Sequence, residues 1–348
     1  MWGNAPLPCR LGGGLDSEAM ALSPSWHAWL SENLLRGVAA DALARDLVAG
    51  GVAPDEASAE VERARRHPAV EAGVRQLGAG AEVASLLDVR AALHAQAGVG
   101  VERRRGVSAE EFRDGYYRAH RPVILEDFLE GWPLLERWRP EALARTHGEV
   151  EVEVMTGREA RADHDLSPDA CRTVMRLSEF LHRLEHGGAT NDLYLTARNF
   201  ALERPELRGL LDDVRFPPGF LHPRPEPGGI KLWIGPAGTR TALHHDVDSV
   251  LFGQVHGRKR FWLIPSFETP RVYNRTHVWS AVDASAPDLE RFPAFGTAHV
   301  HEVVLGPGEL LFIPVGWWHQ VHALDVSVSV TFQCLDLPGG NARWHTSG

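Results

Sequence analysis

The chain has 348 residues, of which 44% are hydrophobic and 24% are charged, and its formal net charge is −10 at pH 7. These values indicate a globular protein with a substantial core, and the negative charge argues against a broad basic surface for nucleic acid. The three cysteines lack metal-ligand spacing and indicate free thiols in a reducing compartment. No signal-peptide pattern and no apolar run of membrane-spanning length is visible. We therefore expect a cytoplasmic protein that binds neither membranes nor nucleic acid.

The N-terminal part of the chain is expected to be helical. Residues 1–22 contain three consecutive glycines and scattered prolines, which predict a flexible tail. From Ser23 the pattern becomes helical, because Ser-Pro is a typical helix start and Trp26 and Leu30 follow at helical spacing. Further helices are expected at Ala40–Ala49, Pro54–Arg66, Pro68–Leu77 and Ala81–Ala97. Residues 23–97 thus predict a small helical domain, which we interpret as a packing or partner-contact unit because no ligand residues cluster in it.

A second domain is expected over residues 107–340, after a connection rich in Gly and Arg. It opens with Ser108-Ala-Glu-Glu111, a capping box that predicts a helix to about His120. Strands and helices are both expected in the stretch that follows. They are a strand at Pro122–Leu125, an aromatic turn at Phe128–Trp138, a helix at Pro140–His147, a strand at Glu149–Met155, a helix at Leu177–Glu185, a strand at Leu193–Arg198 and a helix at Pro205–Val214.

From Ile230 onward the apolar residues recur with a period of two, which is typical of strands. Strands are expected at Ile230–Ile234, Ala242–Asp246, Ser249–Val255, Arg260–Ile264, His299–Leu305, Glu309–Ile313, Trp318–Ala323 and Val326–Cys334. Short strands separated by turns such as Gly306-Pro307-Gly308 favour a sandwich or jelly roll. The predicted fold class is therefore mainly β with α, a jelly-roll domain with flanking helices.

Two of these strand patterns carry residues suited to share a metal ion. His244 and Asp246 stand two residues apart and so project from one face of a strand. His319 lies in another strand pattern, beside two tryptophans. Two histidines and one carboxylate can occupy one face of an octahedral ion and leave the other positions open, as in the facial triad of non-heme Fe(II) oxygenases. A packed or surface histidine is the alternative, but an unpaired Asp246 in apolar surroundings would be costly.

Five neighbouring histidines are interpreted as structural or surface residues. His245 and His322 are expected to face away from the ligands, because successive strand side chains alternate between faces. His256 belongs to a turn, and His299 and His301 belong to an edge-like strand.

Lysine is almost absent from the chain. Of 36 Lys and Arg residues, only Lys231 and Lys259 are lysines. The bias reflects coding preference, so a position that keeps lysine is expected to need its particular chemistry. Lys259 follows the His-x-Asp pair at a distance that places it on an adjacent strand.

Three stretches of the chain together resemble a known family. They read WIGPAGTRTALHHD, FGQVHGRKRFWLIP and PGELLFIPVGWWHQVHALDVSVSVTF. They are similar to the Jumonji-C group of cupin-fold, 2-oxoglutarate-dependent oxygenases, and most to its small hydroxylase branch of asparaginyl and arginyl protein hydroxylases. AVDASAPDLERFPAF at 281–295 also resembles an insert of the arginyl hydroxylases. The resemblance runs from about Phe112 to Gln333 and implies a double-stranded β-helix, without covering the N-terminal helices.

The resemblance also implies a set of site residues. The family's iron ligands fall on His244, Asp246 and His319. The family's lysine that pairs with the distal carboxylate of 2-oxoglutarate falls on Lys259, and the hydroxyl that assists it falls on Thr241. The implied cofactor is Fe(II), with 2-oxoglutarate and O2 as co-substrates.

Further positions either match the family or depart from it. Its strand tyrosine falls on Tyr194, for which an ordinary half-buried strand residue is the alternative. Trp233 matches a substrate-pocket position of the arginyl hydroxylases, for which a core tryptophan is the alternative. An asparagine common in the family is Val250 here, and the residues ending the last strand are Thr331 and Gln333. These departures concern how the 1-carboxylate of 2-oxoglutarate is held.

The resemblance implies a hydroxylase that acts on a protein or peptide side chain and releases succinate and CO2. The alternatives are the same chemistry on a small metabolite or modified nucleoside, a non-catalytic cupin-like binding module, and a cupin metalloenzyme that uses Zn or Mn without an oxo acid. The intact triad with Lys259 and Thr241 argues against the last two. The sequence leaves the substrate, the choice between hydroxylation and demethylation, and the oligomeric state open, with a homodimer among the options.

Overall fold

The computed structural model describes residues 22–344 apart from 36, 99, 162–163 and 166. All of the predicted flexible tail except Leu22 therefore lies outside the described residues. The chain divides into two compact units, Met1–Val89 and Arg90–Gly348. Helix α4 (Pro68–Ala97) contributes residues to both units.

The first unit is a small helical core. It contains α1 (Pro24–Leu35), α2 (Ala40–Ala49), α3 (Pro54–Arg65) and the first part of α4. Its buried side chains come from one face of each helix and include Trp26, Trp29, Leu30, Leu43, Leu47 and Val61. Separate helices at Pro68–Leu77 and Ala81–Ala97 were a wrong prediction, because α4 runs through both. The glycines between them cost about 1 kcal/mol each relative to alanine, which weakens a helix without breaking its hydrogen bonds.

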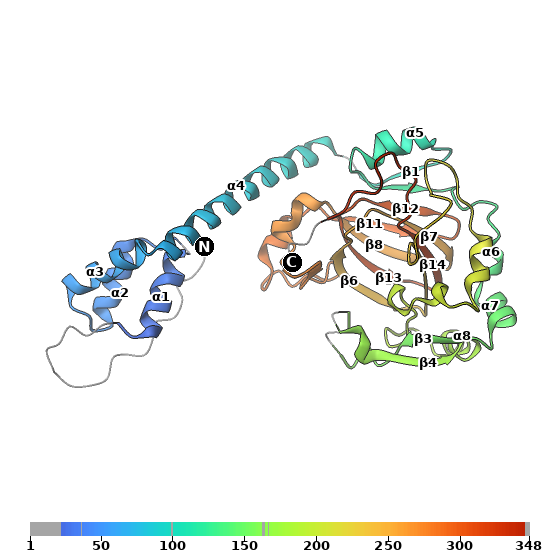
Figure 1. Ribbon diagram of the computed structural model, residues 1–348, viewed down its shortest axis with the longest axis horizontal. Helices are drawn as coiled ribbons and strands as arrows, with labels where there is room; N and C mark the ends of the chain where they lie inside the picture. The colour runs from blue at the N-terminus through green and yellow to red at the C-terminus, as the bar shows by residue number, and fades with distance from the viewer. Residues whose placement is uncertain (1–21, 36, 99, 162–163, 166, 345–348) are drawn as a thin grey trace. The chain divides into compact units, whose positions relative to one another are not determined.

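The second unit contains two facing sheets of six strands each (Figure 1). The first sheet has the order β1-β2-β12-β7-β14-β5, and the second has the order β11-β8-β13-β6-β10-β9. The strands of the first sheet are β1 (Glu102–Arg104), β2 (Val123–Leu125), β12 (Leu310–Ile313), β7 (Val250–His256), β14 (Ser327–Phe332) and β5 (Ile230–Gly235). The strands of the second are β11 (His301–Leu305), β8 (Lys259–Ile264), β13 (Trp318–Ala323), β6 (Arg240–His245), β10 (Trp279–Ser280) and β9 (Asn274–Thr276). The predicted jelly roll is confirmed.

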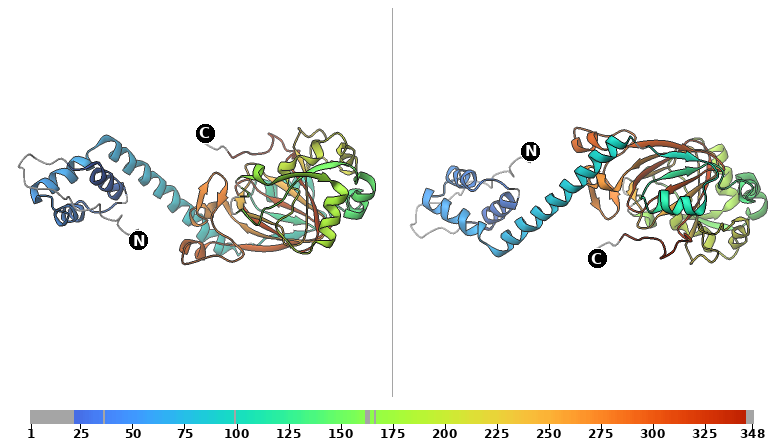
Figure 2. Two further views of the ribbon diagram at one scale, coloured as in Figure 1. Left: turned by 90° about the horizontal axis from the view of Figure 1, so that it is seen from below. Right: turned by 90° about the horizontal axis from the view of Figure 1, so that it is seen from above.

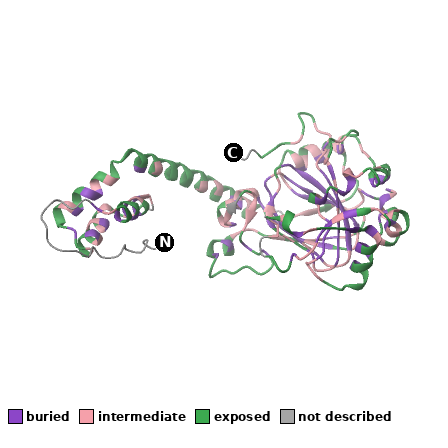
Figure 3. Ribbon diagram, turned by 60° about the horizontal axis from the view of Figure 1, so that its bottom comes forward, coloured by how far each residue is buried: buried purple, intermediate pink, exposed green. Residues whose placement is uncertain are grey.

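Apolar side chains hold three layers together. Phe252, Leu311 and Ile313 of the first sheet pack against Phe261 and Leu263 of the second, which fills one end of the space between the sheets. The outer face of the first sheet packs on α6 (Leu134–Arg137), α7 (Pro140–His147) and α8 (Leu177–His186) (Figure 2). The outer face of the second sheet is covered by the segment between β8 and β11. Figure 3 shows the contrast between these buried strands and the mostly exposed α4.

Strand β14 shows how one sequence pattern serves two environments. Val328, Val330 and Phe332 belong to the core under the helices. Ser329 and Thr331 alternate with them and turn to the inside of the jelly roll. All six residues of β14 are buried, so the hydroxyl groups lie in the interior rather than in solvent.

Several local predictions were wrong. Leu193–Arg198 is not a strand: Tyr194 and Leu195 form isolated bridges, and the chain then enters a 3-10 turn that Thr196 caps. The predicted helix Pro205–Val214 is a 3-10 helix at Arg208–Asp213, whose Asp213 is buried against the Trp138 indole N–H instead of facing solvent.

Further differences lie at the start of the second unit and in short strands, which include β9 and β10 of the second sheet. Ser108 caps a short α5 (Ala109–Glu111), which continues as a π-helical turn and ends at Tyr117 rather than His120. Strand β1 lies in the predicted connection, and β4 (Arg172–Arg176), which pairs with β3 (Glu151–Met155), was missed. None of the helices in the described part of the chain combines the length and apolarity needed to cross a bilayer.

Candidate metal centre

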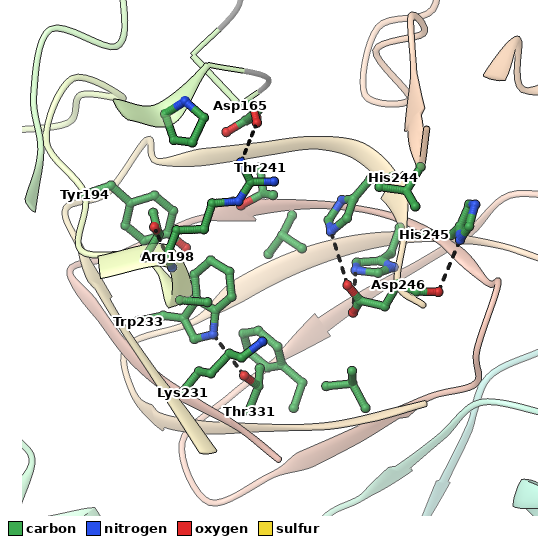
Figure 4. A pocket seen from close by; sticks show the side chains of 18 of the residues that line it. Asp165, Tyr194, Arg198, Lys231, Trp233, Thr241, His244, His245, Asp246 and Thr331 are labelled. Atoms are coloured by element: carbon green, nitrogen blue, oxygen red, sulfur yellow. Dashed lines mark hydrogen bonds and ion pairs between the residues drawn. The ribbon is translucent and has the colours of Figure 1, made fainter. Parts of the chain in front are cut away.

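Two neighbouring strands of the second sheet bring His244, Asp246 and His319 together. His244 on β6 lies opposite His319 on β13, and Asp246 follows directly after the end of β6. The Nε2 atom of His244 lies 3.9 Å from Oδ1 of Asp246, and Nε2 of His319 lies 3.6 Å from Oδ2. One ligand atom from each of the three lies within 4.8 Å of the others. Figure 4 shows the side chains of His244 and Asp246 directed toward each other.

Hydrogen bonds fix which nitrogen of each histidine is free. Nδ1 of His244 lies 2.8 Å from the Ala242 carbonyl oxygen, and Nδ1 of His319 lies 3.1 Å from the Trp317 carbonyl oxygen. Since a carbonyl only accepts, each Nδ1 carries the proton and donates it. Nε2 of both rings is left with its lone pair toward the Asp246 carboxylate. This is the usual way in which proteins orient metal-binding imidazoles.

Burial keeps His319 neutral. Its side chain is buried, and the loss of hydration, together with the nearby His244, lowers the pKa of His319 to about 4. A neutral imidazole is the form that binds metal. Two neutral nitrogen donors and one carboxylate fit Fe(II) in a facial triad, which leaves positions for further ligands.

A cavity of about 300 Å³ opens beside these three residues. Lys259 enters this cavity from β8, where it pairs with Ala323 of β13. His319 lies four residues before Ala323 on β13, so about 13 Å of strand separates the position of Lys259 from that of His319. Lys259 is 1% exposed, and its Nζ donates to the Tyr194 hydroxyl at 3.1 Å. Thr241 also lines this cavity, which we call the pocket. The residues matched to the oxo acid thus share one pocket with the three candidate ligands.

A loop that the sequence did not single out fixes the strand beside Thr241. Nη2 of Arg158, which is 1% exposed, donates to Oδ1 of Asp165 at 3.2 Å and to the Arg240 carbonyl oxygen at 2.9 Å. Oδ2 of Asp165 accepts from the Ala242 N–H at 3.1 Å. The bonds therefore bracket Thr241 on both sides. The sequence does not predict these hydrogen bonds, because the loop has no periodic pattern and lies far from the motifs.

Two tryptophans line the pocket. Trp279 of β10 stacks on His244 with ring centroids 4.7 Å apart and planes at 26°. Trp233 of β5, which the sequence placed at the substrate, lines the pocket and donates its indole N–H to Thr331 Oγ1 at 3.2 Å. The position of Trp279 was missed, because β10 is a two-residue strand inside an irregular segment.

The other histidines lie outside the ligand group formed by the described residues. The His245 ring packs on Trp318, and its Nδ1 donates to the Asp246 backbone carbonyl oxygen rather than to the carboxylate. His322 packs on Trp262 of the neighbouring strand. His301 contacts His94 with 3.2 Å between their Nε2 atoms.

Comparisons with known proteins agree with this geometry. Residues 108–333 match a family described as a cupin-like domain. Over 231 residues the chain is 34% identical to "Lysine-specific demethylase 8" of Xenopus tropicalis, which covers 65% of this chain and 50% of that protein. Over 257 residues it is 27% identical to human "tRNA wybutosine-synthesizing protein 5", covering 68% of this chain and 78% of that protein. Over 107 residues it is 44% identical to "HSPB1-associated protein 1" of Rattus norvegicus, covering 28% and 22%.

The names of these relatives point to different substrates, and one name refers to tRNA. The expected absence of a nucleic-acid partner therefore has no support from the relatives. The chain spans about half the length of the demethylase relatives it matches. The matched cupin-like region covers more than half of the chain and contains every candidate site residue. The chain belongs to the cupin-like Jumonji-C family of Fe(II)- and 2-oxoglutarate-dependent oxygenases.

Proposed function

We propose that this chain is a dioxygenase that hydroxylates a protein or peptide side chain. The observation that carries the proposal is the pocket, which has His244, Asp246 and His319 on one side and Lys259 with Thr241 on another. A metal site alone would fit many cupins. A buried lysine without a carboxylate partner among the described residues, in the same pocket, specifically suits an acidic co-substrate.

Each protein group has a defined task in this proposal. His244, Asp246 and His319 would hold Fe(II), and Lys259 with Thr241 would hold the far carboxylate of 2-oxoglutarate by charge-assisted hydrogen bonds. With the metal and co-substrate bound, the chemistry supplied is oxidation by O2, in which one oxygen atom enters a substrate C–H bond and the other enters succinate as CO2 leaves.

The chain's own contribution is orientation and exclusion of water. Carbonyl acceptors hold both imidazoles in the ligating tautomer, and the stacked Trp279 restrains His244. The loop bonds at Arg240 and Ala242 fix Thr241 relative to the metal ligands. Trp233 and Trp279 line the pocket, and their bulk leaves less room for water around a bound substrate side chain.

A second candidate keeps the chemistry and changes the substrate. The relative named for wybutosine synthesis aligns over 78% of its own length, which favours a modified nucleoside more than a small metabolite. Removal of an N-methyl group would be the same hydroxylation on a methyl carbon, as the names of the demethylase relatives suggest.

Anaerobic addition of Fe(II) and 2-oxoglutarate tests the site. A weak visible band near about 500 nm is expected for the wild type and should be absent in His319→Ala. His322→Ala is the matched control, because it removes a histidine from the same strand outside the ligand group. No band in the wild type, or a band that survives in His319→Ala, would refute the proposal. Mass spectrometry for a gain of about 16 Da on protein, peptide and tRNA pools then separates the substrate classes.

A further inference from the structure

The two lysines of the chain line the same pocket. Lys259 stands on β8 of the second sheet, and Lys231 stands on β5 of the first sheet. All other basic residues among the 36 Lys and Arg are arginines. Two lysines from opposite sheets therefore converge on one cavity of about 300 Å³.

Lys231 projects into the part of the pocket bounded by the first sheet. It is two residues from Trp233 on β5 and so shares its face, and it pairs in register with Thr331 of β14. Figure 4 shows Lys231 extending into the pocket beside Thr331 and Trp233. Farther along this wall, Val250 of β7 lies opposite Ile313 of β12, and both side chains are apolar. Lys231 is thus the charged donor on an otherwise largely apolar wall.

Lys231 differs from the other Lys and Arg side chains that line the pocket in that no described residue accepts a hydrogen bond from it. Arg158 donates to the Asp165 carboxylate, Arg198 donates to the backbone carbonyl oxygen of Asp165, and Lys259 donates to the Tyr194 hydroxyl. No hydrogen bond or ion pair joins Lys231 to any residue in the described ranges. Burial lowers the pKa of the Lys231 ammonium, and the negative charge of nearby aspartates only opposes this shift. A half-buried ammonium without a partner is costly, so the position favours binding of an anion.

The proposed co-substrate has two carboxylates, and Lys259 with Thr241 accounts for one. We propose that Lys231 binds the other, the carboxylate of 2-oxoglutarate adjacent to its keto group, from the first-sheet side of the pocket. This inference rests on the proposed function and deepens it. It assigns a residue to the carboxylate beside the keto group, on the wall of the pocket that contains Val250. The same charge would also suit a carboxylate of the primary substrate, so the test separates the two sources.

Calorimetric titration of the metal-loaded protein without O2 tests the assignment by binding alone. Lys231→Met is expected to weaken binding of 2-oxoglutarate by about 10- to 100-fold, the usual worth of a hydrogen bond to a charged group. It should weaken 2-oxopentanoate, which keeps only the carboxylate beside the keto group, by a similar factor. It should leave 4-oxopentanoate, which keeps only the far carboxylate, unchanged. Lys259→Met should give the reverse pattern for the two monocarboxylates.

Three controls make the outcomes unambiguous. Lys231→Arg keeps the charge and should restore part of the affinity, and Arg224→Met removes an exposed cation outside the pocket and should change nothing. Melting curves check that Lys231→Met and a second variant, Lys231→Gln, are folded. Wild-type affinity of folded Lys231→Met for 2-oxoglutarate overturns the inference, and a loss confined to acidic peptide substrates assigns the charge to the substrate instead. If the wild type itself fails to bind 2-oxoglutarate, the proposed function is what fails.

Discussion

Replacing Lys259 by methionine should change stability and co-substrate binding in opposite directions. The side chain is 1% exposed, its Nζ donates to Tyr194, and it lies 5.4 Å from the ring centres of both Tyr194 and Phe252. No carboxylate among the described residues forms an ion pair with it. A buried charge without a counter-charge costs several kcal/mol, and methionine keeps the packing while removing that charge. The ligand-free variant should therefore be at least as stable as the wild type.

Binding of 2-oxoglutarate should be weakened strongly. Removing one partner of a buried charge pair costs about 2–5 kcal/mol, or about 30-fold to 4000-fold in affinity. At a concentration 100 times the wild-type Kd, the ligand stabilises the wild type by about 2.7 kcal/mol, and a variant weakened about 100-fold gains only about 0.4 kcal/mol. Thermal melting of the metal-loaded protein with and without 2-oxoglutarate measures both quantities. Tyr194→Phe is the matched control and should lose about 1 kcal/mol of binding, because only a neutral hydroxyl is removed. Equal ligand-induced stabilisation of Lys259→Met and wild type would refute the reasoning.

Three further perturbations probe other parts of the chain. Gly235→Ala should weaken 2-oxoglutarate binding in the same melting assay, because the new Cβ would lie 2.7 Å from the Tyr194 ring. Leu30→Ala should destabilise the first unit by about 2–5 kcal/mol in urea without changing metal binding by the second, since Leu30 is fully buried in the helical core. Burial lowers the pKa of His322 from 6.5 to about 4, so stability should fall as pH falls from 6.5 toward 4, where the unfolded chain binds the extra proton. His322→Gln should flatten that fall between about pH 7 and pH 5, and an unchanged slope would contradict it.

The parts of the site that lie on regular strands could be predicted from the sequence. Strand alternation is local, so the two-residue spacing of His244 and Asp246 already implied a shared face, and the structure brings both to His319 across neighbouring strands. The bounds of β13 were predicted without error. Whether the three residues bind iron stays a prediction that the spectroscopic test addresses.

The parts that depend on irregular segments could not be predicted. Arg158 and Asp165 reach β6 through a loop, and the stacking of Trp279 on His244 depends on a two-residue strand. The segment around Tyr194 was predicted as a strand, yet only two residues pair there before a capped turn begins. In each case a long-range hydrogen bond or ring contact determines the conformation. The periodicity of the sequence does not predict such a contact.

The scarcity of lysine became informative only once the fold placed both lysines. In sequence, Lys231 and Lys259 are 28 positions apart, and only Lys259 matched a position of the family. The jelly roll puts β5 and β8 in opposite sheets, so both side chains enter one pocket of about 300 Å³ from two sides. That space must admit a five-carbon dicarboxylate and part of a substrate. A compact ammonium on a flexible stem leaves more of that space to the ligand than the broad, planar guanidinium of arginine would, which is a physical reason for lysine at both positions in a chain that otherwise uses arginine.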